Sequence, residues 1–236
     1  MAKPPPVQQC RWHVTRDARA MYAAVAERTL AAADQAVQQR GHFVIVLAGG
    51  NTPRGVYELL CSGAANWSKW HVYFGDERCA PRDDPARNSR MAEAAWLGHV
   101  PIPARQVHEM PAELGPIEAA KRYAATLESV GEFDLVLLGL GEDGHTGSLF
   151  PAHDPGRCAN APSVLAVLDA PKPPAHRVTM SARRFSRTKE AIFIVTGEEK
   201  REAVQRWRAG KCLSACATTP RTGVDVFVGG AILQSS

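Results

Sequence analysis

The chain has 236 residues, of which 45% are hydrophobic and 22% are charged, a balance typical of folded globular proteins that excludes a disordered or fibrous chain. The formal net charge is only +4 at pH 7 and the basic residues are spread out, so we expect no nucleic-acid partner. The sequence has no apolar run long enough for a membrane span and no signal-peptide pattern at its start, so we expect no membrane partner and a cytoplasmic location.

The first predicted elements are a helix, a strand and a second helix. The alanine-rich segment from Thr15 to Arg40 predicts a long amphipathic helix that stops at Gly41. The sequence HFVIVLA at 42–48 is rich in β-branched and aromatic residues, which predicts a buried parallel strand. The next helix is expected at 53–60.

The remainder of the chain repeats this alternation. Strands are expected at 70–74, 133–138, 163–169, 176–181, 191–196 and 224–228, and helices at 86–97, 117–130 and 198–209. Such alternation implies right-handed crossovers. We therefore predict an α/β fold with three layers, a doubly wound, largely parallel, Rossmann-like sheet with helices on both faces. No repeat or Gly/Ser linker divides the chain, so a single domain at 1–236 is expected, with proline-rich segments 151–162 and 170–175 as surface loops or a lid.

Four polar segments each follow directly on a predicted strand. They are GGNTP at 49–53, GDER at 75–78, GLGEDGHTGSLFP at 139–151 and GEEK at 197–200. A glycine after one strand can simply make a turn. Loops at the carboxyl ends of parallel strands also build the ligand crevice of such sheets. The four segments together favour the second interpretation and predict one shared site.

The first of these segments has the composition of an anion site at a helix N-terminus. Gly49 and Gly50 permit close backbone approach, Asn51 or Thr52 can cap the helix, and Pro53 suits its first turn. Unpaired N–H groups and the helix dipole favour phosphate there. A plain helix cap is the alternative. The segment is not a Walker P-loop, because no Gly-Lys-Ser/Thr follows.

Two cationic side chains are further candidates. Lys200 lies near a helix start, where an anionic ligand would offset its unfavourable position in the helix dipole; a surface position is the alternative. In GDER, Arg78 can clamp a phosphate or another substrate oxygen while a carboxylate holds it, and a salt-bridged turn is the alternative. Asn88 and Ser89 either cap the helix that follows or reach a sugar hydroxyl.

His145 is the candidate for chemistry. A histidine among acidic residues at a strand end can be oriented by a carboxylate and act as a general base, although a structural histidine is the alternative. The GxGxxG match at 139–144 does not indicate a dinucleotide site, because Pro151 and Pro155 leave no room for the helix that should follow. Ser148 has no GxSxG context, and no HExxH or paired-cysteine pattern is present. We therefore expect no metal and no cofactor.

Five blocks resemble, in order, those of the 6-phosphogluconolactonase family: LAGGNTPRGVYELL, VYFGDERCAPRDDPARNSRMAEAAWL, FDLVLLGLGEDGHTGSLFP, RVTMSARRF and IFIVTGEEKREAV. The resemblance spans about Phe43 to Val204. The GDER and GEDGHTGSLFP blocks are specific to that family, whereas GGNTP is shared with the glucosamine-6-phosphate deaminases. Those enzymes carry a DEY-type turn and a GHIAFNEP-type block instead. Asn51 stands where the family often has Ser, and VDVFVGGAIL lacks the acidic residue expected before its small residues.

The resemblance implies hydrolysis of 6-phosphoglucono-δ-lactone to 6-phosphogluconate in the oxidative pentose phosphate pathway, without metal or organic cofactor. It implies that His145 is the general base, that Asp143 and Arg78 assist it, and that the substrate and its phosphate contact Gly49, Gly50, Asn51, Thr52, Arg78, Arg177 and Lys200. It leaves open how the roles at the substrate are divided between Arg78 and Arg177.

A δ-lactone is an activated ester, so orientation, a base and oxyanion stabilisation suffice for its hydrolysis. The implied partner is a small sugar-phosphate substrate, and a monomer or weak dimer is expected. An amino-sugar-phosphate isomerase-deaminase on the same scaffold is one alternative. A non-enzymatic sugar-phosphate sensor is the other. The intact His145 block favours the lactonase.

Overall fold

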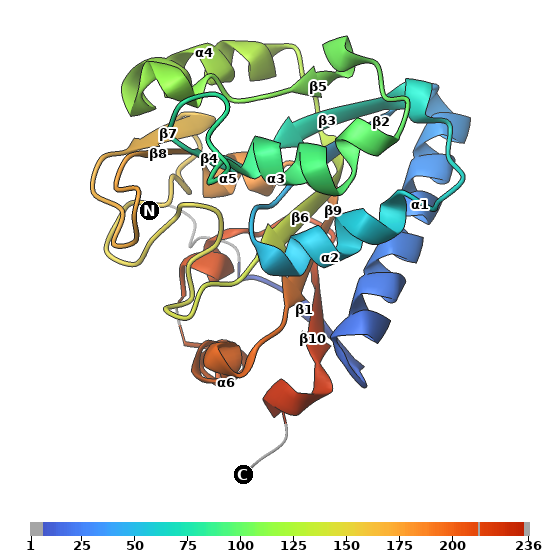
Figure 1. The fold of residues 1–236 in the computed structure, drawn as a ribbon. Coiled ribbons are helices and arrows are strands. Elements are labelled where there is room, and N and C mark those ends of the chain that lie inside the picture. The colour runs from blue at the N-terminus through green and yellow to red at the C-terminus, as the bar shows by residue number, and fades with distance from the viewer. Residues whose placement is uncertain (1–6, 212, 234–236) are drawn as a thin grey trace.

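A parallel sheet forms the centre of the molecule (Figure 1). The structure is a computed structural model that describes residues 7–211 and 213–233. Within this part of the chain the sheet has seven strands, in the order β1-β10-β9-β6-β2-β3-β5. Their bounds are β1 (Cys10–Thr15), β10 (Val224–Gly229), β9 (Thr188–Val195), β6 (Phe133–Gly139), β2 (Phe43–Leu47), β3 (Trp70–Phe74) and β5 (Val107–His108). All neighbouring strands pair in parallel, which confirms the predicted α/β fold.

The central strands are rich in apolar residues because helices and loops cover both faces of the sheet and exclude water. Every residue of β2, FVIVL, is buried, as expected for a parallel strand covered on both faces. The helices around the sheet are α1 (Ala18–Arg40), α2 (Asn51–Leu60), α3 (Asn88–Ala95), α4 (Pro116–Glu128), α5 (Ala182–Phe185) and α6 (Arg201–Arg208). Asp17 caps the start of helix α1, its carboxylate accepting from the Ala20 N–H at 2.7 Å, and the helix stops at Gly41 as predicted.

Strands near 163–169 and 176–181 are present, but they belong to a second, antiparallel sheet. Its order is β4 (Asp76–Arg78), β8 (Arg177–Met180) and β7 (Val164–Val167). Too few residues separate β7 from β8 for a crossover helix, so this pair can only be antiparallel. The chain leaves the main sheet at Gly75, whose N–H donates to the Leu47 carbonyl and whose carbonyl accepts from the Met180 N–H. The second sheet therefore begins beside the carboxyl ends of β2 and β3.

Other differences from prediction lie at edges and helix ends. Strand β1 was not expected; its alternating exposed residues at the sheet edge give a weak signal. It is held by Asp225 of β10, which accepts from Arg11 and His13. Helix α2 begins at Asn51, two residues before the predicted start, and the segment at 198–200 is a 3₁₀ turn that precedes α6.

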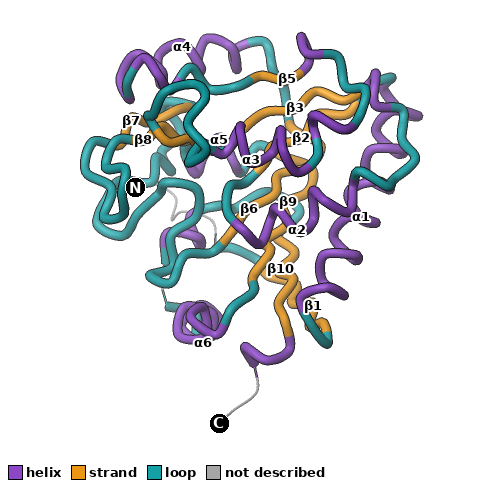
Figure 2. Tube along the Cα trace, viewed as in Figure 1, coloured by secondary structure: helices purple, strands orange, loops and turns teal. Residues whose placement is uncertain are grey.

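Loops cover the side of the molecule on which the candidate site lies. Figure 2 shows the strands surrounded by helices except on one side, where long loops run between β6 and β7 and between β7 and β8. These loops contain the proline-rich segments predicted at 151–162 and 170–175. Over the described residues, none of the helices combines the length and the apolar character needed to cross a membrane.

Candidate active site

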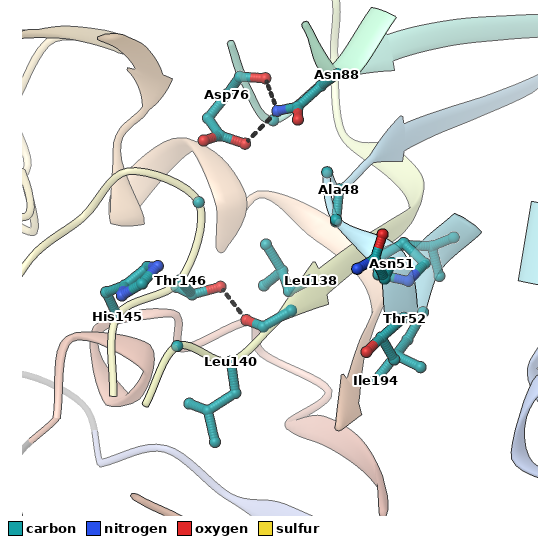
Figure 3. Close-up of a pocket in the computed structure, with 18 of the residues that line it drawn as sticks. Ala48, Asn51, Thr52, Asp76, Asn88, Leu138, Leu140, His145, Thr146 and Ile194 are labelled. Carbon is teal, nitrogen blue, oxygen red and sulfur yellow. Dashed lines mark hydrogen bonds between the residues drawn. The ribbon is translucent and has the colours of Figure 1, made fainter. Parts of the chain in front are cut away.

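One cavity of about 300 Å³ is lined by residues from all four predicted loops. It lies at the carboxyl ends of β2, β3, β6 and β9. Figure 3 shows His145 on one side of it and Asn51 and Thr52 on the opposite side. The other predicted residues on its wall are Gly49, Gly50, Arg78, Arg177 and Lys200. Asp143 lies behind His145 and contacts it directly.

The imidazole of His145 is fixed from three directions. Its Nδ1 lies 2.5 Å from Asp143 Oδ1, and its backbone N–H donates to the same oxygen at 3.0 Å. Its ring centroid lies 4.7 Å from that of Phe150. The ring packs closely against Gly141, where a Cβ atom would fall 2.0 Å from Nδ1. The side chain is 18% exposed. When Nδ1 carries the proton shared with Asp143, Nε2 keeps the lone pair that can accept another.

Asp143 is suited to hold that tautomer. Burial by itself would raise the pKa of Asp143, but hydrogen bonds from the backbone and ring of His145 outweigh it and hold the pKa below its usual value. The carboxylate is therefore ionised at neutral pH. A fixed negative charge at Nδ1 orients the ring and stabilises it when Nε2 takes a proton.

Hydrogen bonds tie the loop that carries His145 to both sheets. The Thr146 hydroxyl donates to the Gly139 carbonyl at 2.8 Å, at the end of β6. The Ser148 hydroxyl is buried and donates to Asp76 Oδ2 of β4 at 2.7 Å. Ser148 therefore has a structural partner, in keeping with the absence of a nucleophile motif around it.

The opposite side of the cavity presents the start of α2. No side chain of the described residues caps this helix, so its first N–H groups can donate to a ligand. The Thr52 hydroxyl lies 2.7 Å from that of Thr196, and Lys200 from the loop after β9 lines the same cavity. Thr196 was not predicted from the sequence, although its place as the residue after β9 resembles that of the other site loops. These groups together suit an anion.

Arg78 and Arg177 lie directly opposite each other across β4 and β8. Like charges in that position repel unless an anion lies between them or near them. Arg177 donates to the carbonyls of Lys172, Pro173 and Pro174 at 3.0–3.1 Å, and burial lowers its pKa. Arg78 Nη1 donates to the Ala86 carbonyl, whereas its Nε is buried and lacks a hydrogen-bond partner among the described residues. Among the described residues, Arg177 thus donates to three carbonyls and Arg78 to one.

Glu77 positions the turn that carries Arg78 through the backbone. Its fully buried carboxylate accepts from the N–H groups of Arg78, Asn88 and Ser89 at 2.7–2.8 Å. Burial raises the pKa of Glu77, against these hydrogen bonds and the nearby guanidinium of Arg87. The predicted salt bridge from a neighbouring carboxylate to the Arg78 guanidinium is not formed within the described residues. Asn88 and Ser89 begin α3, but no side-chain cap of this helix is formed within the described residues; the carboxylate of Glu77 accepts from their backbone N–H groups instead.

Asn88 also lies on the cavity wall. Its amide nitrogen donates to Asp76 O and Oδ1 at 2.9 and 3.1 Å, which leaves Oδ1 of Asn88 buried without a hydrogen-bond partner in the described structure. Gly49 makes room for it, because a Cβ there would lie 1.9 Å from that oxygen. An unpaired acceptor on a cavity wall suits a ligand hydroxyl. Over residues 7–211 and 213–233, no group of three or more His, Cys, Asp or Glu side chains is arranged to hold a metal ion.

Comparisons with known proteins agree on one group. The family model described as Glucosamine-6-phosphate isomerases/6-phosphogluconolactonase matches residues 16–226. The chain is 39% identical over 202 residues to the 6-phosphogluconolactonase of Mycobacterium tuberculosis, covering 80% of this chain and 81% of the relative. It is 39% identical over 179 residues to that of a Synechocystis species, covering 72% and 73%.

Solved structures give the same result. The 6-phosphogluconolactonase of Thermotoga maritima superposes with a TM-score of 0.86 and 26% identity, covering 94% of this chain and 100% of that one. A monomeric glucosamine-6-phosphate deaminase superposes with a TM-score of 0.79 and 19% identity, covering 95% and 100%. The second likeness is one of fold alone.

Proposed function

Because the chain belongs to the 6-phosphogluconolactonase family, within the group of glucosamine-6-phosphate isomerases and 6-phosphogluconolactonases, we propose that it hydrolyses 6-phosphoglucono-δ-lactone to 6-phosphogluconate in the oxidative pentose phosphate pathway, using a water molecule activated by His145. One observation carries the proposal. The carboxylate-oriented imidazole and the uncapped start of α2 line opposite sides of one cavity, as a substrate with a reactive carbon at one end and a phosphate at the other requires.

The phosphate end of the substrate binds at the start of α2. Backbone N–H groups of Gly50, Asn51 and Thr52 offer donors with the positive end of the helix dipole behind them, and Lys200 adds a full positive charge. Asn88 Oδ1 accepts from a sugar hydroxyl. Binding energy from this non-reacting end holds the ring so that the lactone carbon faces the imidazole.

His145 acts first as a base and then as an acid. Nε2 takes a proton from water as the water oxygen attacks C1 of the lactone, and a tetrahedral oxyanion forms. The C1–O bond of the ring then breaks, and the ring oxygen leaves as a hydroxyl that takes the proton from Nε2. The carboxylic acid product loses its own proton to solvent.

Arg78 and Arg177 have different roles in this proposal. Arg78 donates to a single carbonyl among the described residues, which supports contact of its guanidinium with a substrate oxygen, either of the phosphate or of the oxyanion at C1. The contacts of Arg177 with three carbonyls support a role in holding the segment at 170–175 against the cavity. Both add positive potential that favours an anionic substrate.

The test of function is an assay of acid release from freshly made lactone with no metal added. We expect the purified protein to raise the rate well above spontaneous hydrolysis in the same buffer. Ammonia release from glucosamine-6-phosphate without lactone hydrolysis would instead identify a deaminase. Tight binding of 6-phosphogluconate with no turnover of the lactone would identify a sensor.

Asp143→Asn tests the orientation of the imidazole. We expect kcat to fall about 10²-fold with little change in KM, because the amide can present N–H to Nδ1 and favour the wrong tautomer. Steady-state kinetics of lactone hydrolysis give both constants. Asp83→Asn, at an exposed aspartate outside the cavity, is the matched control and should leave both unchanged. A kcat for Asp143→Asn equal to that of the unmodified protein would show that the ring needs no carboxylate.

A further inference from the structure

The carboxylate of Glu142 lies between two lysines at the candidate site. Its Oε1 is 3.3 Å from Lys172 Nζ and 3.6 Å from Lys200 Nζ. Both lysines line the cavity, and they come from segments that are distant in sequence. Glu142 is not on the cavity wall; its side chain is 52% exposed, whereas that of Lys200 is only 17% exposed. One carboxylate oxygen of Glu142 thus pairs with the ammonium groups of two lysines that line the cavity.

Both partners keep Glu142 ionised. A hydrogen bond from Lys172 and then the charges of Lys172 and Lys200 lower the pKa of Glu142 below its usual value. Lys200 has a second carboxylate, Glu199, at 3.9 Å. In the unliganded protein the cations at this side of the cavity are therefore matched by acidic side chains of the protein itself.

The carboxylate of Glu142 and the ammonium groups of Lys172 and Lys200 form one ion group. Lys172 also links this ion group to the proline-rich segment at 170–175. Its own carbonyl and those of the next two residues accept from Arg177. Arg177, which lines the cavity, thus binds the backbone of the segment at 170–175, while the Lys172 side chain of the same segment extends to the exposed carboxylate of Glu142. Glu142 is joined directly in sequence to Asp143, so the ion group lies between the catalytic loop and the segment at 170–175.

We propose that Glu142 is an internal counter-ion that competes with the phosphate of the substrate for Lys172 and Lys200, and so sets how tightly phosphorylated ligands are held. This inference rests on the proposed function, in which Lys200 binds the phosphate. A dianion that approaches the two lysines meets the carboxylate charge at close range and is repelled by it. Glu142 thereby weakens phosphate binding and speeds release of the phosphorylated product.

Glu142→Gln tests the proposal, because glutamine keeps the length of the side chain and an acceptor oxygen but removes the charge. We expect the Kd of inorganic phosphate, measured by titration calorimetry at low ionic strength, to fall about twofold to fivefold, as suits a half-exposed charge. KM for the lactone should fall in parallel. The difference should shrink as salt is added, because exposed charges are screened.

Glu198→Gln is the matched control. Glu198 is 62% exposed and pairs with Arg201 at 3.1 Å, not with a lysine of the cavity. We expect the Kd of phosphate to be unchanged by it. Glu142→Asp retains the charge and should stay closer to the unmodified protein than Glu142→Gln does.

An unchanged or higher Kd of phosphate in Glu142→Gln would overturn the proposal, since it would show that the carboxylate positions the lysines and does not compete for them. Absence of any phosphate binding in either protein would overturn it as well. The calorimetric comparison needs no turnover. Failure of the unmodified protein to hydrolyse the lactone would therefore count against the proposed function alone.

Discussion

Replacing His145 by glutamine is expected to lower kcat/KM for lactone hydrolysis by about 10²- to 10⁴-fold, the usual contribution of a general base. Glutamine fills much of the space of the imidazole and can still form hydrogen bonds, but it cannot take a proton from water at neutral pH. Binding at the start of α2 does not depend on the imidazole, so KM should change much less than kcat. A pH-stat or a coupled assay of the product measures the rate above spontaneous hydrolysis.

His153→Gln is the control for this experiment. The ring of His153 also contacts Phe150, at 6.1 Å between centroids, and pairs with Asp169 at 3.3 Å, but it does not line the cavity. The same chemical change at a histidine outside the cavity should leave the rate unaltered. Equal rates for His145→Gln and the unmodified protein would remove His145 from the mechanism.

The parallel sheet was predictable because its signal is local. Strand β2 is a continuous apolar run, β6 contains the apolar run LVLL, and α1 has a clear end at Gly41. Strand β1 was missed because half of its residues face solvent at a sheet edge, where no apolar pattern is required. The local sequence of β7 and β8 does not show whether they join the main sheet. That depends on the direction of the chain after Gly75, which is fixed by hydrogen bonds between Gly75 and distant strands.

The candidate site likewise has some features with a local sequence signal and others that depend on contacts between distant segments. The convergence of four loops followed from the rule that parallel strands share a carboxyl edge, and the segment containing Asp143 and His145 has its partners two residues apart. The ion group of Glu142, Lys172 and Lys200 depends on three loops meeting, and no single segment indicates it. The exposed position of Lys172 in a proline-rich loop gives no sign of its place on the cavity wall.

Arg87→Met is expected to lower the free energy of unfolding by about 3 to 5 kcal/mol, because it leaves Glu77 as a buried charge without a nearby cation. The side chains of Arg87 and Glu77 are both fully buried, with Arg87 Nε 3.6 Å from Glu77 Oε2. Arg87 also donates to Glu113 at 3.0 Å and to the Met110 carbonyl at 2.7 Å. Methionine fills the space but replaces none of these interactions. Urea unfolding followed by circular dichroism measures the loss.

The loss should depend on pH in a defined direction. Burial already raises the pKa of Glu77, and an acid with a raised folded-state pKa stabilises the fold at low pH and loses that contribution as pH rises through the raised value. Removal of Arg87 raises this pKa further, so the penalty should be smaller at about pH 5 than at about pH 8. Arg82→Met, at an exposed arginine 3.9 Å from Glu109, should cost less than about 0.5 kcal/mol at either pH. A penalty for Arg87→Met that is equally small at both pH values would mean that Glu77 is neutral in the folded protein and needs no counter-ion, and a penalty that falls as pH rises would show that the loss does not come from an ionised Glu77.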